Sequence, residues 1–70
     1  MQVATDETAG MRLRDLRKAS GLTQRELALL LGVTETALRS WEAGRYEPSR
    51  RHQRAIAKRF GVEVDELTFG

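Results

Sequence analysis

The sequence predicts an all-α fold, a compact bundle of four to five short helices formed by one chain of 70 residues. Apolar residues recur three and four positions apart, which is the spacing of one face of a helix. The single proline and the internal glycines fall between these stretches. No alternation of apolar and polar residues, the pattern typical of a strand, continues beyond a few positions. A chain of this length has room for one small domain.

The first helix follows a short leader. Residues 1–10 have no helical period, and we expect a flexible leader there and a single domain over residues 11–70. From residue 11 on the pattern becomes helical, with Leu13 and Leu16 three positions apart. Gly21 is expected to end this helix in a left-handed conformation.

The second helix begins at a capping box, the four residues Thr23–Glu26. In such a box the threonine hydroxyl accepts from the amide of the third helical residue, and the glutamate side chain accepts from the amide of the threonine. This signal predicts a helix over 24–31, with Leu27, Ala28 and Leu31 on its buried face.

The third helix completes a helix–turn–helix unit. Gly32 interrupts the apolar pattern, and Thr34 is a good N-cap for a helix over 35–43. Two short helices joined by a tight turn that contains glycine form this supersecondary unit. If Leu38 and Trp41 face the core, a rotation of about 100° per residue directs one set of side chains outward. That set is Thr36, Arg39 and Ala43, flanked by Glu35 and Ser40. An exposed helix of this kind fits the major groove of DNA.

Two more helices complete the predicted bundle. Ser49 caps a fourth helix over 50–60, whose apolar stripe is expected to be Ala55, Ile56, Ala57 and Phe60. Residues 62–67 are expected to form a short fifth helix. Trp41 is expected in the core and His52 on the surface. Val64 and Phe69 either form a dimer patch or pack over the first helix.

Composition excludes several classes of function. There are no cysteines and one histidine, so disulfides, metal sites and bound cofactors are not expected. The histidine has no nucleophile at a persuasive spacing, and we do not expect an enzyme. No apolar run is long enough to cross a membrane, and we expect a cytoplasmic protein. All 12 basic residues but only five of the ten acidic ones lie between Arg12 and Arg59, which favours a polyanionic partner.

Three runs of residues carry a resemblance to a known family. They are L-R-x-x-x-G-L-T-Q-x-E-L-A-x-x-L-G-V-T over 16–34, L-x-x-W-E-x-G followed by P-S over 38–49, and A-K-R-F-G-V-x-V-D-E-L over 57–67. In this order and spacing they resemble the phage repressor/Cro type of helix–turn–helix regulator, the XRE family, which has the lambda-repressor-like fold. The resemblance covers the chain apart from the leader.

The resemblance implies specific roles for residues of this chain. The positions that reach base edges in the family match Glu35, Thr36 and Ser40, with Arg39 between them. Phosphate contacts are expected from Thr23, Gln24, Thr34, Arg45 and Tyr46 and, outside the family pattern, from Arg50 and Arg51. Arg17 and Glu42 match an ion pair that braces the first helix against the third.

This sequence departs from the family pattern at two places. The fourth helix opens with the polar residues 50–54 where apolar residues are usual, so we expect its first turn to be exposed and its arginines to extend the phosphate-binding surface. Glu35 is an acid where neutral amides are common. Either its carboxylate accepts a hydrogen bond from a cytosine amino group, or the acid is there because the helix dipole stabilises a negative charge in the first turn. Arg39 either contacts a guanine or a phosphate, or is part of a solvated helix face.

We therefore expect a sequence-specific double-stranded DNA-binding transcriptional regulator, and specifically a repressor. One domain of this size covers little DNA, so we expect a homodimer on a palindromic site. The alternative is an antitoxin or another protein-interaction module that uses the same fold.

Overall fold

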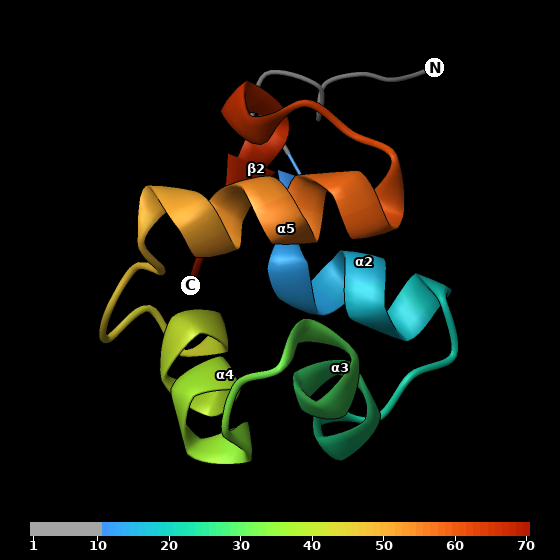
Figure 1. The fold of residues 1–70 in the computed structure, drawn as a ribbon, viewed down its shortest axis with the longest axis vertical. Coiled ribbons are helices and arrows are strands. Elements are labelled where there is room, and N and C mark those ends of the chain that lie inside the picture. Colours follow the sequence, from blue (N-terminus) through green and yellow to red (C-terminus); the bar gives the residue numbers. More distant parts are fainter. Residues whose placement is uncertain (1–10) are drawn as a thin grey trace.

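The computed structural model describes residues 11–70, and the predicted leader over residues 1–10 lies outside them. Within the described residues the α-helices are α2 (Leu13–Ala19), α3 (Gln24–Leu31), α4 (Glu35–Glu42) and α5 (Arg50–Phe60). In Figure 1, α5 crosses the upper part of the molecule, and α3 and α4 lie together below it. The predicted all-α fold is confirmed.

Threonine and serine caps set the starts of three of these helices, as the sequence predicts. The Thr23 hydroxyl accepts from the Glu26 amide at 3.0 Å, and the Glu26 carboxylate accepts from the Thr23 amide at 2.8 Å. The Thr34 hydroxyl accepts from the Ala37 amide at 3.0 Å. The Ser49 hydroxyl accepts from the amide three positions further on. Each cap satisfies a backbone donor that the helix itself leaves free.

The core receives one fully buried aliphatic side chain from each α-helix, and these are Leu13, Leu27, Leu38 and Ile56. Trp41 is buried beside them, as predicted. Val64 and Phe69 pack against this core, which favours the second of the two alternatives for them. Ala55 does not belong to the predicted apolar stripe of α5. It is exposed, because a rotation of about 200° separates it from the buried Ala57 and places it on the opposite side of the helix.

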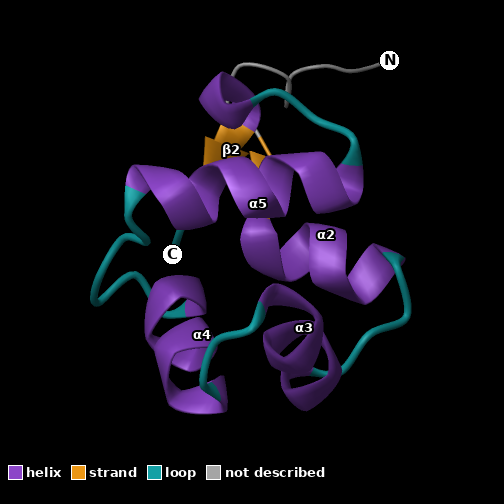
Figure 2. Cartoon of the chain, viewed as in Figure 1, coloured by secondary structure: helices purple, strands orange, loops and turns teal. Residues whose placement is uncertain are grey.

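The ends of the described chain form a small parallel sheet that the sequence did not predict (Figure 2). The strands β1 (Met11–Arg12) and β2 (Leu67–Thr68) pair with Met11 opposite Leu67. This pairing also corrects the fifth helix. Instead of a helix over 62–67 there is only the 3₁₀ turn η1 (Val64–Glu66), because Leu67 adopts an extended conformation and joins the sheet.

Two glycines hold backbone conformations that other residues rarely adopt. Gly32, between α3 and α4, has φ +72° with open space around its α-carbon. Gly44, which follows α4, has φ +78°, and a β-carbon there would lie 3.1 Å from the α-carbon of Gly70. The first supports the turn between the two helices, and the second permits close contact between the α4–α5 loop and the last described residue.

Candidate nucleic-acid interface

One side of α4 is bare in the structure. Thr36, Arg39 and Ala43 are exposed, whereas Glu35 and Ser40 are half-buried. Leu38 and Trp41 are buried on the opposite side, so the predicted orientation of the helix is confirmed. Of the exposed side chains, those of Thr36 and Ala43 are short, and that of Arg39 is long and charged. This side of α4 and its C-cap, defined by Glu35, Thr36, Arg39, Ser40 and Ala43, is called the outer face below.

Arg39 is held by two neighbours rather than projecting freely. Its Nη2 donates to Glu35 Oε2 at 2.8 Å, one helical turn away on the same helix. Its Nε donates to Gln24 Oε1 at 3.2 Å, at the start of α3. The Arg39 and Glu35 side chains are 59% and 37% exposed, so their attraction is well screened by water. The pair nevertheless restricts where the guanidinium points.

The predicted bracing pair is present and buried. Arg17 donates from Nε to Glu42 Oε2 at 2.7 Å and from Nη2 to Glu42 Oε1 at 3.1 Å. Its Nη1 also donates to the carbonyl of Leu22 at 2.9 Å. The two side chains are only 10% and 4% exposed. This two-pronged contact joins α2 to α4 and fixes how the outer face sits relative to the rest of the domain.

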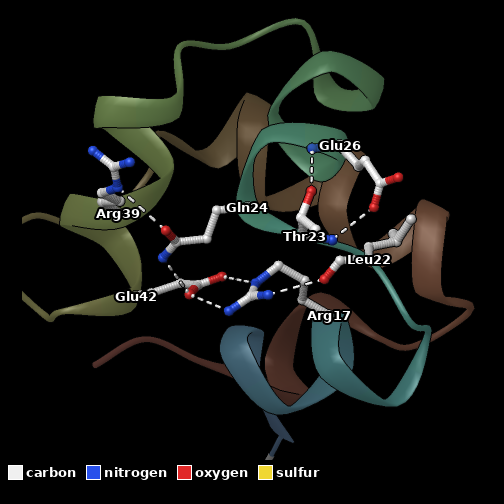
Figure 3. A network of polar contacts seen from close by, with 7 residues as sticks. All are labelled: Arg17, Leu22, Thr23, Gln24, Glu26, Arg39 and Glu42. Carbon is white, nitrogen blue, oxygen red and sulfur yellow. Dashed lines mark hydrogen bonds and ion pairs between the residues drawn. The ribbon is translucent and has the colours of Figure 1, made fainter.

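Gln24 connects the buried pair to the outer face (Figure 3). Its Nε2 donates to Glu42 Oε1 at 3.0 Å, while its Oε1 accepts from Arg39. Both ends of the amide are therefore engaged within the domain. The resulting chain of contacts, Arg17–Glu42–Gln24–Arg39–Glu35, is called the polar relay below.

A basic hollow of about 520 Å³ lies beside the polar relay. Its lining includes the Arg17–Glu42 pair and adds Arg14 and Lys18 from α2 and Arg45 from the α4–α5 loop. Of the described residues that line the hollow, only Glu42 has a carboxylate, and it is already paired with Arg17. Arg14, Lys18 and Arg45 therefore have no carboxylate partner among these lining residues, which favours the entry of an anion such as a phosphate.

Arg14 and Lys18 were not among the predicted contacts. The sequence carried one signal for them, since residues four positions apart share one helix face and Leu13 assigns the opposite face to the core. Of the predicted phosphate contacts, Gln24 and Arg45 line the hollow. Tyr46, Arg50 and Arg51 are exposed but do not line it.

The predicted phosphate ligands Thr23 and Thr34 act as helix caps. Their hydroxyl oxygens accept from backbone amides, as described above, and both residues are exposed. Each therefore lies where a helix N-terminus meets solvent. Such termini present free backbone amides and a partial positive charge, the combination that binds phosphates.

The first turn of α5 is only partly as exposed as expected. Arg50 and Arg51 are exposed, whereas His52 is half-buried, and its ring centroid lies 5.3 Å from that of Trp41. Its Nδ1 also lies 3.1 Å from the Ser49 hydroxyl. Packing against a core tryptophan explains why the histidine turns inward.

Comparison with known proteins also identifies a helix–turn–helix. A family model described as helix-turn-helix matches residues 13–67, which include α2, α3, α4 and α5. The chain belongs to this helix–turn–helix family. None of the solved structures gave a significant match to the chain.

Three relatives place this helix–turn–helix domain among proteins named as regulators. The HTH-type transcriptional activator BcrR of Enterococcus faecalis is 41% identical over 59 residues, which are 84% of this chain but only 29% of BcrR. An uncharacterized HTH-type transcriptional regulator of Methanothermobacter thermautotrophicus is 45% identical over 57 residues, 81% of this chain and 83% of its own length. One of Methanocaldococcus jannaschii is 38% identical over 56 residues, 80% of this chain and 85% of its own.

Within residues 11–70 no three histidine, aspartate or glutamate side chains gather closely enough to hold a metal ion. Nor does any helix in that range combine the length and the apolar character needed to cross a membrane. The large apolar residues Leu29 and Leu30, which are neighbours on α3, are 73% and 50% exposed.

Proposed function

We propose that this chain binds double-stranded DNA at specific sequences and regulates transcription, with the outer face of α4 in the major groove. The observation that carries the proposal is the bare, polar outer face beside the basic hollow. An α-helix fits the width of the major groove, where each base pair presents its own pattern of donors and acceptors. We propose base contacts from Glu35, Thr36, Arg39 and Ser40.

Phosphate contacts would hold α4 in the groove. The basic hollow supplies Arg14, Lys18 and Arg45 at one side of the outer face. The N-termini of α3 and α4, at Thr23 and Thr34, add backbone amides. We also propose phosphate contacts from Gln24, Tyr46, Arg50 and Arg51, all of which are exposed or half-buried. Contacts of this kind set orientation and affinity but do not select a sequence.

We propose that two copies act together on a palindromic site. A single module of this kind covers about 600–1,000 Å² of protein surface on DNA, which limits the sequence that one copy reads. Two copies with half-sites about one helical turn apart would read twice as many base pairs. Sedimentation of the protein with a duplex that carries one selected palindromic site should show two copies bound to each duplex. A single copy bound to each duplex would contradict the homodimer.

The test of the proposed function is the selection of bound sites from a pool of randomised duplexes. We expect a short, two-fold symmetric consensus, and affinity that falls steeply as salt is raised, because each neutralised phosphate releases counterions. Binding to no duplex, or equal binding to every duplex, would contradict the proposal.

We propose repression as the direction of regulation, because a domain that covers promoter DNA blocks polymerase without further contacts. The relative BcrR is named an activator, so the assay must register both directions. A reporter gene placed behind the selected site should be expressed less when the protein is present. Increased expression would contradict repression but not DNA binding.

One observation favours a second candidate, a protein-interaction module such as an antitoxin. Leu29 and Leu30 stand exposed on α3, and Leu30 borders both a small apolar hollow with Leu22 and a second hollow with Lys58 and Arg59. Exposed leucines close together are typical of protein contact surfaces. Replacing both by serine should leave DNA binding unchanged and abolish any protein partnership.

A further inference from the structure

The guanidinium of Arg39 has a defined set of unused donors. Arginine carries five N–H groups. One, on Nε, is donated to Gln24 at 3.2 Å, and one of the two on Nη2 is donated to Glu35 at 2.8 Å. Within residues 11–70, both hydrogens of Nη1 and the second hydrogen of Nη2 donate to no other residue. In Figure 3 the two terminal nitrogens point away from Gln24. Each terminal nitrogen of the guanidinium therefore keeps at least one donor, and these donors are called the fork below.

This fork matches one base better than the others. In the major groove guanine presents two adjacent acceptors, O6 and N7, which a planar pair of N–H donors contacts together. A phosphate needs a positive charge nearby but tolerates many orientations of the side chain. Restraining the guanidinium at two points fixes its plane. A fixed plane strengthens binding most where the two donors must be coplanar with the acceptors, which is at a base edge.

The orientation of Gln24 is itself fixed from behind. Its Nε2 donates to Glu42 Oε1 at 3.0 Å, and Glu42 is held by the buried Arg17. If the amide were rotated by half a turn, an NH₂ group would face the Arg39 Nε–H and a carbonyl would face the Glu42 carboxylate. Both contacts would then be repulsive, so the buried pair dictates that Gln24 Oε1 faces Arg39.

We propose that Arg39 reads a guanine through Nη1 and Nη2, and that Gln24 and Glu35 are positioning residues that set the plane of its guanidinium. The proposal rests on the proposed function and deepens it. Gln24 then acts on sequence preference through Arg39, in addition to any contact of its own with a phosphate. The buried pair of α2 and α4 thereby contributes to specificity without touching DNA.

The test compares two duplexes, the selected site and the same site with its most discriminating guanine replaced by adenine in each half. The wild-type protein should bind the guanine duplex more tightly by about tenfold or more. Arg39→Lys keeps the charge but removes the fork, and it should bind both duplexes about equally. Gln24→Ala should lower the preference for guanine by about threefold or more. When it is added to Arg39→Lys, it should change the preference no further.

Arg25→Ala is the matched control. Arg25 is an exposed arginine on α3 that takes no part in the polar relay. Its removal takes away one positive charge from α3 and should leave the preference for guanine at the wild-type value. Thermal unfolding by circular dichroism checks that every variant is folded at the binding temperature, and the exposed position of Arg39 keeps its lysine variant informative.

Two results would overturn the proposal while leaving the proposed function intact. The first is a guanine preference that survives Arg39→Lys, which would assign Arg39 to a phosphate. The second is an equal loss of affinity for both duplexes on Gln24→Ala, which would make Gln24 a phosphate ligand alone. Failure of the wild-type protein to select any site would instead refute the proposed function itself.

Discussion

Replacing Glu42 by alanine is expected to cost about 3–5 kcal/mol of folding free energy, because it leaves a buried guanidinium without its counter-charge. The Glu42 side chain is 4% exposed and that of Arg17 is 10% exposed. The carboxylate accepts three hydrogen bonds, two from Arg17 and one from Gln24, at 2.7–3.1 Å. Among residues 11–70, only the Leu22 carbonyl would still accept from the guanidinium. A domain of this length is stable by about 4–10 kcal/mol, so the variant loses a large part of its stability.

Urea unfolding followed by tryptophan fluorescence measures this loss, because Trp41 is buried next to Glu42 in the sequence. Far-ultraviolet circular dichroism checks that the helices unfold in the same transition. Glu35→Ala is the control. It breaks the exposed ion pair with Arg39 and should cost only about 0.3–0.5 kcal/mol.

A double variant separates pairing from burial. Arg17→Met combined with Glu42→Leu removes both charges and keeps apolar volume in their place, so it should be far more stable than Glu42→Ala and close to the wild type. The reasoning is refuted if Glu42→Ala costs no more than Glu35→Ala, since the pair would then be effectively exposed. It is also refuted if the double variant is as unstable as the single one.

Three further predictions concern the backbone, the core and the DNA. Gly32→Ala should cost about 1 kcal/mol through the strain of φ +72°, and Gly44→Ala should cost more because its new β-carbon would meet backbone 3.1 Å away. Thermal unfolding that ranks them the other way would refute this. Leu38→Ala should cost about 2–5 kcal/mol in the same assay because the residue is fully buried, and a cost below 1 kcal/mol would place it outside the core. Arg14→Ala and Lys18→Ala should each reduce the slope of log K against log salt by about 1. Unchanged slopes would mean that α2 does not approach the phosphates.

The starts of three helices could be predicted from the sequence because local signals determine them. Thr23, Thr34 and Ser49 are caps that act within three residues of themselves, and the helices begin where these residues predict. The pairing of Met11 with Leu67 could not be read in the same way. Its strands are two residues long, and it joins positions far apart in the chain, so no alternation of side chains reveals it.

In the candidate site, too, local features could be predicted from the sequence and long-range contacts could not. The outward direction of Arg39 follows from the rotation of about 100° per residue, once Leu38 and Trp41 are assigned to the core. The Arg17–Glu42 pair spans 25 positions and was inferred from the family resemblance, not from spacing. The contact between Gln24 and Arg39 spans 15 positions and depends on how α3 crosses α4. A contact of that kind depends on two side-chain conformations and a crossing angle, none of which the residue pattern specifies.

The most direct test of the central claim is a nuclear magnetic resonance titration of the nitrogen-15-labelled protein with a duplex that carries the selected site. If the outer face of α4 lies in the major groove, the largest amide shifts should fall on residues 35–43, with smaller ones at Gln24, Arg45 and the basic hollow. Shifts concentrated around Leu29 and Leu30, with residues 35–43 unmoved, would contradict it.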